Sequence, residues 1–230
     1  MVLLHGVPSS GAYWLPLMRQ LADHRRVVGL DLLGFGRSPR STNGDYSLAT
    51  HSAAIIATLQ ALDLPTPWVV VGHSFGSLLA VQLATTRPEL IDRLVLTSLP
   101  AYHDSGQVIR QLARSRVSPR YVLDGIRAWV QTAMGERHSY QTLPAQSQSP
   151  LWVSPRDRSI AQFIIDQSTI QALTGLTAPV TVLNGQRDVL LRGIDHSWLD
   201  QLEHVRVQWL PGGHQLPLDH PQAVVAAITG

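Results

Sequence analysis

The chain has 230 residues, of which 44% are apolar and 15% are charged. This length suits a single domain whose core is large enough to fold without a metal or a disulfide, and the composition excludes a disordered chain and a coiled coil. Cysteine is absent, so thiol nucleophiles, thiolate metal sites and disulfides are excluded.

All 18 basic residues are arginine and the net charge is +2 without a basic run, so we expect no nucleic-acid partner. No apolar run approaches the ~18 residues of a membrane span. No signal peptide precedes the first apolar run, Val2–Leu4. We therefore expect a protein of the cytoplasm whose chain begins almost inside a strand.

Short apolar runs alternate with longer amphipathic stretches along most of the chain. Strands are predicted over Val2–His5, Arg26–Asp31, Trp68–Gly72, Arg93–Thr97, Pro179–Leu183 and Val205–Leu210. Helices are predicted over Gly11–Asp23, Leu48–Leu62, Phe75–Thr86, Ile194–Leu202 and Gln222–Ile228. The strands are continuously apolar, as in a parallel sheet covered on both faces. The alternation predicts an α/β fold with a doubly wound, mostly parallel sheet of about six strands.

Residues 101–175 interrupt this rhythm. Apolar spacing predicts helices near Gln107–Arg116, Arg120–Met134 and Arg158–Leu173, and the Ser-, Gln- and Pro-rich stretch Ser139–Pro155 is predicted to be a loop or hinge. We expect residues 1–100 and 176–230 to form the core and residues 101–175 to form a helical lid over the strand ends.

Gly72, His73, Ser74, Phe75 and Gly76 match the pattern Gly-x-Ser-x-Gly. The pattern alone is weak, but here a Val-rich strand precedes it and a helix follows at once. Such a strand-to-helix turn strains the backbone of Ser74, exposes its hydroxyl and needs glycines where side chains would clash beneath it. We therefore predict a nucleophile at Ser74, with an ordinary glycine-rich turn as the alternative.

A serine hydroxyl needs a general base, and the base needs an acid that orients it. His214 follows the predicted strand Val205–Leu210, and Asp188 follows the predicted strand Pro179–Leu183. Because ligands bind at the carboxyl ends of parallel strands, we expect Ser74, Asp188 and His214 to come together as a catalytic triad. Taken singly, the histidine and the aspartate could each be an ordinary loop residue.

Other candidates for the base and the acid fit less well. His220 reads as part of the entry to the last helix, while Asp195 and Asp200 fall in the predicted helix after Asp188 and are expected to be solvated. The ten histidines show no metal-ligand spacing with carboxylates, so we expect neither a metal nor another cofactor.

A tetrahedral intermediate needs two amide donors for its oxyanion. We expect one from the backbone of Phe75 and the other from Val7, in the loop after the first strand, where Gly6 permits an unusual turn. His5 is interpreted as a structural clamp on this loop, with a catalytic role as the alternative. His73 is interpreted as packing under the turn.

Five motifs, HGVP, DLLGFGRS, GHSFG, NGQRD and PGGH, follow one another in this order. Together they resemble the α/β-hydrolase superfamily over the whole chain except residues 101–175. The resemblance implies the fold of that family, a variable lid, catalytic roles for Ser74, Asp188 and His214, and an oxyanion hole at Val7 and Phe75. A serine nucleophile disfavours the epoxide hydrolase and haloalkane dehalogenase branches.

The sequence departs from the family pattern at its start. Family members usually begin with an antiparallel pair of strands, whereas nothing precedes Met1 here, and Val189 stands where a proline usually follows the acid. Without that pair, the strand Arg26–Asp31 would be an apolar sheet edge. Either this edge is covered by other means, a second copy among them, or the sequence starts late; we expect a monomer or a homodimer.

The sequence indicates the substrate class only through the charges and aromatic residues of the predicted lid. Residues 101–160 carry eight arginines and four acidic residues, which would suit a carboxylate-bearing substrate, although solvated surface arginines are the alternative. Residues expected near the substrate are His5, Gly6, His73, Tyr102, Trp129 and Trp152. The aromatic members of this set could instead belong to the core.

The triad and the resemblance predict a serine hydrolase that acts on a small carboxylic ester or a related acyl compound through an acyl-enzyme. One alternative keeps the triad but changes the reaction, to C–C bond hydrolysis or pyruvate elimination on a carboxylate-bearing substrate. Another alternative is a non-catalytic small-molecule receptor on the same fold, which an intact triad disfavours.

Overall fold

The computed structural model describes residues 1–23, 25–114, 155, 158–159 and 168–230. Within these residues, one sheet of six strands runs in the order β2-β1-β3-β4-β5-β6, and every neighbouring pair is parallel. The strands are β1 (Val2–Leu4), β2 (Val28–Leu30), β3 (Trp68–His73), β4 (Ile91–Thr97), β5 (Val180–Gly185) and β6 (Val205–Leu210). The predicted doubly wound α/β fold is confirmed.

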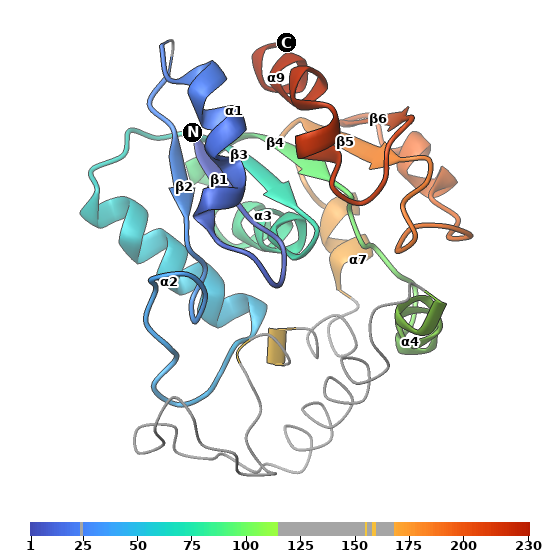
Figure 1. Ribbon diagram of the computed structural model, residues 1–230, viewed down its shortest axis with the longest axis horizontal. Coiled ribbons are helices and arrows are strands. Elements are labelled where there is room, and N and C mark those ends of the chain that lie inside the picture. Colours follow the sequence, from blue (N-terminus) through green and yellow to red (C-terminus); the bar gives the residue numbers. More distant parts are fainter. Residues whose placement is uncertain (24, 115–154, 156–157, 160–167) are drawn as a thin grey trace.

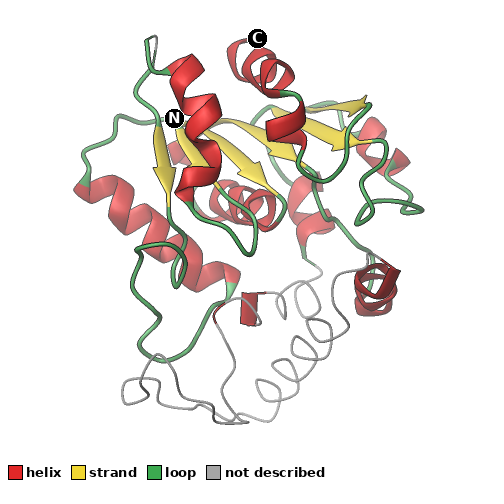
Figure 2. Cartoon of the chain, in the orientation of Figure 1, coloured by secondary structure: helices red, strands yellow, loops and turns green. Residues whose placement is uncertain are grey.

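Helices cover both faces of the sheet, as Figures 1 and 2 show. One face carries α1 (Leu15–Leu21) and α9 (Pro221–Thr229), and the other carries α2 (Leu48–Ala61), α3 (Phe75–Thr86) and α7 (Thr169–Thr174). Successive side chains along a strand point to opposite faces of the sheet, so each strand packs against both helix layers. In β1, Val2 and Leu4 pack with the layer of α2 and α3, whereas Leu3 between them packs with the layer of α1 and α9.

Some predicted helices have different bounds in the structure. The 3-10 helix η1 (Gly11–Trp14) precedes α1, and the short elements η2 (Pro88–Leu90) and α8 (Leu216–Asp219) stand where the sequence predicted no helix. The predicted helix Ile194–Leu202 is wrong, because this stretch holds only the 3-10 helix η4 (Ser197–Gln201).

The shortening of this element has a local cause. The Asp195 carboxylate accepts the Ser197 N–H at 2.9 Å, so residues 195–197 form a turn and η4 begins only at Ser197. At the other end Leu202 is already extended, with φ −95° and ψ 113°, as the chain enters β6.

The described part of the 101–175 block contains helix α4 (Ser105–Arg114), which begins two residues before the predicted helix, and α7. The predicted helix Arg120–Met134, and nearly all of the predicted loop Ser139–Pro155, lie outside the described residues. Of the predicted helix Arg158–Leu173, residues 160–167 also lie outside them, and its end coincides with α7. Among the described helices, none is both long and apolar enough to cross a membrane.

Candidate active site

Ser74 occupies the sharp turn between β3 and α3. Its backbone has φ 52° and ψ −117°, a left-handed conformation that a residue with a side chain rarely adopts. The Ser74 N–H donates to the Thr97 carbonyl of the neighbouring strand at 2.9 Å, which fixes the turn to the sheet. The predicted strain at Ser74 is therefore present, at the carboxyl end of a central strand. The predicted exposure of Ser74 is wrong, because the residue is only 4% exposed.

The two glycines of the motif allow close backbone contacts around this turn. A Cβ atom on Gly72 would lie 2.4 Å from the Gly76 carbonyl oxygen, and one on Gly76 would lie 2.2 Å from the Leu4 carbonyl oxygen. Both contacts are to backbone, which cannot move aside as a flexible side chain can. Gly72 is thus required where β3 meets the start of α3, and Gly76 is required where α3 meets β1.

Asp188 and His214 form a direct pair after β5 and β6. The Asp188 carboxylate is buried, and its Oδ2 lies 2.9 Å from His214 Nδ1. The His214 side chain keeps 21% of its surface exposed, so one side of the imidazole is open to an approaching molecule. In the described part of the chain, no hydrogen bond joins His214 to the Ser74 hydroxyl. Such contacts are often long without a substrate.

Backbone contacts hold the two loops of this pair together. The N–H of Gln186 donates to the Leu210 carbonyl and the N–H of Arg187 donates to the Gly212 carbonyl, both at 2.9 Å. A Cβ atom on Gly185 would lie 2.4 Å from the Gly213 carbonyl oxygen. The acid loop and the base loop therefore lie against each other, and a glycine makes that approach possible.

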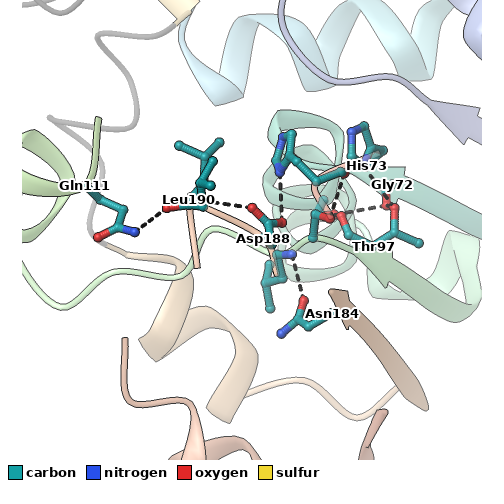
Figure 3. A network of polar contacts seen from close by, with 12 residues as sticks. Gly72, His73, Thr97, Gln111, Asn184, Asp188 and Leu190 are labelled. Atoms are coloured by element: carbon teal, nitrogen blue, oxygen red, sulfur yellow. Dashed lines mark hydrogen bonds and ion pairs between the residues drawn. The ribbon is translucent and has the colours of Figure 1, made fainter. Parts of the chain in front are cut away.

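The His73 ring lies beside the His214 ring. The two ring centroids are 5.0 Å apart, and on another side His73 stacks on Tyr13, also at 5.0 Å, with 12° between the ring planes. Thr97 Oγ1 donates to the Gly72 carbonyl and so accepts from His73 Nδ1 at 3.2 Å (Figure 3). Burial, followed by the neighbouring charge of His214, holds the pKa of His73 well below its ordinary value. His73 is thus a neutral ring packed against His214.

His5 links the loops that follow β1 and β2. The Leu32 N–H donates to His5 Nε2 at 3.0 Å, so the other ring nitrogen, Nδ1, carries the proton and donates to the Gly6 carbonyl at 2.7 Å. Burial lowers the pKa of His5, which favours this neutral form. These contacts match the interpretation of His5 as a clamp.

The clamp also orients the peptide between Gly6 and Val7. In a trans peptide the carbonyl and the N–H point in opposite directions, so the N–H of Val7 points away from His5. A Cβ atom on Gly6 would lie only 3.1 Å from Ser74 Cβ, which puts this loop against the turn that carries Ser74. Phe75, the other expected amide donor, is the first residue of α3. Whether both amides bind an oxyanion stays a prediction.

Of the three aromatic residues expected near the substrate, the structure describes Tyr102. Tyr102 is buried in a small cluster with Val108, and its hydroxyl donates to the Leu190 carbonyl at 3.1 Å. Its polar end is thus bound to the acid loop. Trp129 and Trp152 lie outside the described residues. Within the described residues, no group of three metal-ligating side chains comes together.

Several contacts at the site were not predicted. Ser98 Oγ donates to the His214 carbonyl at 3.0 Å, and the buried Asn184 accepts the Leu99 N–H at 3.2 Å. Thr97 and Ser98 lie at the carboxyl end of β4. The three triad residues were predicted because they too lie at the carboxyl ends of strands. The same criterion, applied to β4, would have identified Thr97 and Ser98.

A family model described as the alpha/beta hydrolase fold matches residues 1–221. The pimeloyl-[acyl-carrier protein] methyl ester esterase of Aeromonas salmonicida is 41% identical over 103 residues, which are 44% of this chain and 39% of that protein. The chain thus spans well under half the length of this curated relative.

Solved structures resemble the chain over nearly its full length. A thioesterase domain from the curacin biosynthetic pathway has a TM-score of 0.68 and 26% identity, over 100% of this chain and 90% of that one. The meta-cleavage product hydrolase CumD of Pseudomonas fluorescens IP01 has a TM-score of 0.69 and 22% identity, over 99% of this chain and 88% of that one. Because the family model matches nearly all of the 230 residues, the chain belongs to the alpha/beta hydrolase fold family.

Proposed function

We propose that the chain is a serine hydrolase that cleaves a small carboxylic ester or a related acyl compound. The observation that carries the proposal is the pair formed by the buried Asp188 and His214, 2.9 Å apart. This pair lies beside the strained turn that carries Ser74, since the ring of His214 is next to that of His73. A serine needs a base to become a nucleophile, and the base needs an acid that fixes its tautomer.

In this mechanism, Asp188 keeps a proton on Nδ1 of His214, so that Nε2 is free to act as the base. Ser74 Oγ attacks the acyl carbon while Nε2 takes its proton, and the amides of Val7 and Phe75 bind the oxyanion. His214 then returns the proton to the leaving group. A water molecule, deprotonated by His214, attacks the acyl-enzyme, releases the acid and restores Ser74.

The substrate class draws support from a sequence relative. The protein that is 41% identical over 103 residues is named as a methyl ester esterase. Ester hydrolysis needs a nucleophile, a proton carrier and an oxyanion site. Ser74, His214 and the two amides would provide all three.

The proposal is tested by covalent labelling with a fluorophosphonate, which reacts with activated serines. We expect wild type to be labelled at one site, Ser74, and to hydrolyse short p-nitrophenyl esters. Ser74→Ala should abolish labelling and lower kcat by at least about 10³-fold. Asp188→Asn should slow both reactions by a similar factor, because the imidazole then holds its proton on the wrong nitrogen.

A matched control is Ser197→Ala, since Ser197 is an exposed serine of η4. It should be labelled and should turn over substrate as wild type does. If folded wild type resists the probe, or if Ser74→Ala is labelled as fast as wild type, the proposed function is wrong.

A further inference from the structure

A side chain of helix α4, that of Gln111, binds the acid loop, residues 188–192. Gln111 is 4% exposed, and its Nε2 donates to two carbonyls of this loop, that of Val189 at 2.5 Å and that of Arg192 at 3.1 Å. An amide group has two N–H donors, so each carbonyl receives one. With its amide reversed, Gln111 would turn an oxygen toward two carbonyl oxygens, so the contact fixes the orientation of the side chain.

The loop that Gln111 holds is the one that orients Asp188. The Leu190 N–H donates to Asp188 Oδ1 at 2.9 Å, which leaves Oδ2 for His214 Nδ1. The carbonyl that Gln111 holds at the shorter distance belongs to Val189, and it is in the same peptide unit as the Leu190 N–H. The direction of this peptide therefore sets both contacts: the carbonyl points to Gln111 and the N–H points to Asp188.

Figure 3 shows this path from Gln111 through Leu190 to Asp188. Tyr102 acts on the next peptide, because its hydroxyl donates to the Leu190 carbonyl at 3.1 Å. Both side chains come from the segment that follows β4, some 80 residues before the loop, so the loop's own sequence does not fix these peptides alone.

We propose that Gln111 is a positioning residue for the Asp188–His214 pair, acting by fixing the peptide between Val189 and Leu190. This inference rests on the proposed function, in which that pair activates Ser74. Gln111 touches no reacting atom; it keeps the Leu190 N–H aimed at Oδ1 and so keeps Oδ2 in line with His214. Tyr102 supports the same loop through one contact instead of two.

Gln111→Leu tests the proposal, because it keeps the size of the side chain and removes both donors. We expect a fall of about 10-fold in kcat and in the fluorophosphonate labelling rate. This is the rate equivalent of one neutral hydrogen bond, the one to the Val189 carbonyl, which shares a peptide with the Leu190 N–H. KM for p-nitrophenyl acetate should stay within about twofold of wild type, because Gln111 does not bind substrate. Tyr102→Phe should have a smaller effect in the same direction.

A spectroscopic readout separates positioning from a general loss of structure. The proton that His214 Nδ1 shares with Asp188 is expected at the low-field end of the ¹H NMR spectrum, identified by its absence in His214→Gln. In Gln111→Leu it should move upfield or broaden through exchange with water. The matched control is Gln20→Leu, since Gln20 is an exposed glutamine whose amide also donates to a backbone carbonyl, that of Pro16 at 3.5 Å. It should match wild type in all measurements.

The outcomes distinguish this inference from the proposed function. If wild type is not labelled, the proposed function fails, and the NMR signal still decides whether Gln111 holds the pair. If wild type is labelled, and folded Gln111→Leu and Tyr102→Phe are labelled at its rate with an unchanged NMR signal, the inference is overturned. Should Gln111→Leu not fold, Tyr102→Phe decides by the same two measurements.

Discussion

Gly76 stands where the backbone of α3 meets that of β1, and its place is defined by contacts to main-chain atoms. A Cβ atom there would lie 2.2 Å from the Leu4 carbonyl oxygen and 2.8 Å from that of His5. Gly213, in the loop before His214, has no atom within 4 Å of such a Cβ. The two glycines thus differ sharply in what they tolerate.

We predict that Gly76→Ala lowers the free energy of unfolding by about 3 kcal/mol or more, because either α3 or β1 must shift to accommodate the methyl group. Gly213→Ala is the matched control and should change it by less than about 1 kcal/mol. Urea unfolding followed by circular dichroism measures both. Equal losses in the two variants would contradict the steric argument.

Single site residues could be predicted from the sequence where a motif or the end of a strand marks them. Ser74, Asp188 and His214 each follow a strand, and the structure brings the last two into contact. The contact of Gln111 with the acid loop could not be predicted, because it joins residues 78 and 81 positions apart through a helix whose place on the sheet the sequence leaves open.

Helix α2 is an element whose start is fixed by side chains. Ser47 is its N-cap residue and accepts the Thr50 N–H at 3.2 Å, while Asp45 accepts the Ser47 N–H at 2.9 Å. The helix then buries Ile55 and Leu59 against the sheet. The cap satisfies an N–H that the helix itself leaves without a partner.

We predict that Ser47→Ala destabilises the protein by about 1 kcal/mol, since the cap is lost while the buried face of α2 is unchanged. In a domain of this size that is a fall of about 2–4 °C in the melting temperature. Ser47→Thr keeps the hydroxyl and should retain most of the stability. A melting temperature of Ser47→Ala that equals that of wild type would show that the cap contributes nothing.

The bounds of α2 and α3 were predicted to within about one residue, because each helix has a marked start: a side-chain cap at Ser47 for α2 and the sharp turn at Ser74 for α3. The predicted helix Ile194–Leu202 was wrong for the converse reason. Its apolar residues have helical spacing, but the turn that Asp195 makes with the Ser197 N–H delays the start of the element to Ser197, and the chain is extended again at Leu202. A local side-chain contact thus outweighed the periodicity.

Over the whole molecule, neutral histidines are buried at several places. Burial lowers the pKa of His5, His51, His73 and His196. For His51 the pKa falls from 6.5 to about 4, since desolvation outweighs the attraction of Asp45, and the charge of His5 lowers it further. The unfolded chain therefore binds these protons at a higher pH than the folded chain does.

We predict that stability falls as the pH drops from about 6.5 toward 4, because protons bind the unfolded state first. His51 alone accounts for about 3 kcal/mol of this loss, by the ordinary conversion of its pKa change. His51→Leu should therefore lose less stability than wild type over the same range. Urea unfolding at pH 7 and at pH 4.5 measures the difference, and equal losses in the two proteins would contradict this assignment.

The contact between the acid loop and the base loop has a practical consequence. Gln186 takes part in this contact through its backbone: its N–H donates to the Leu210 carbonyl, while its side chain is exposed. Because the chain contains no cysteine, Gln186→Cys would give the protein a single thiol, two residues before Asp188. A fluorophore attached there would report on the surroundings of the acid loop while Ser74, Asp188 and His214 stay unchanged.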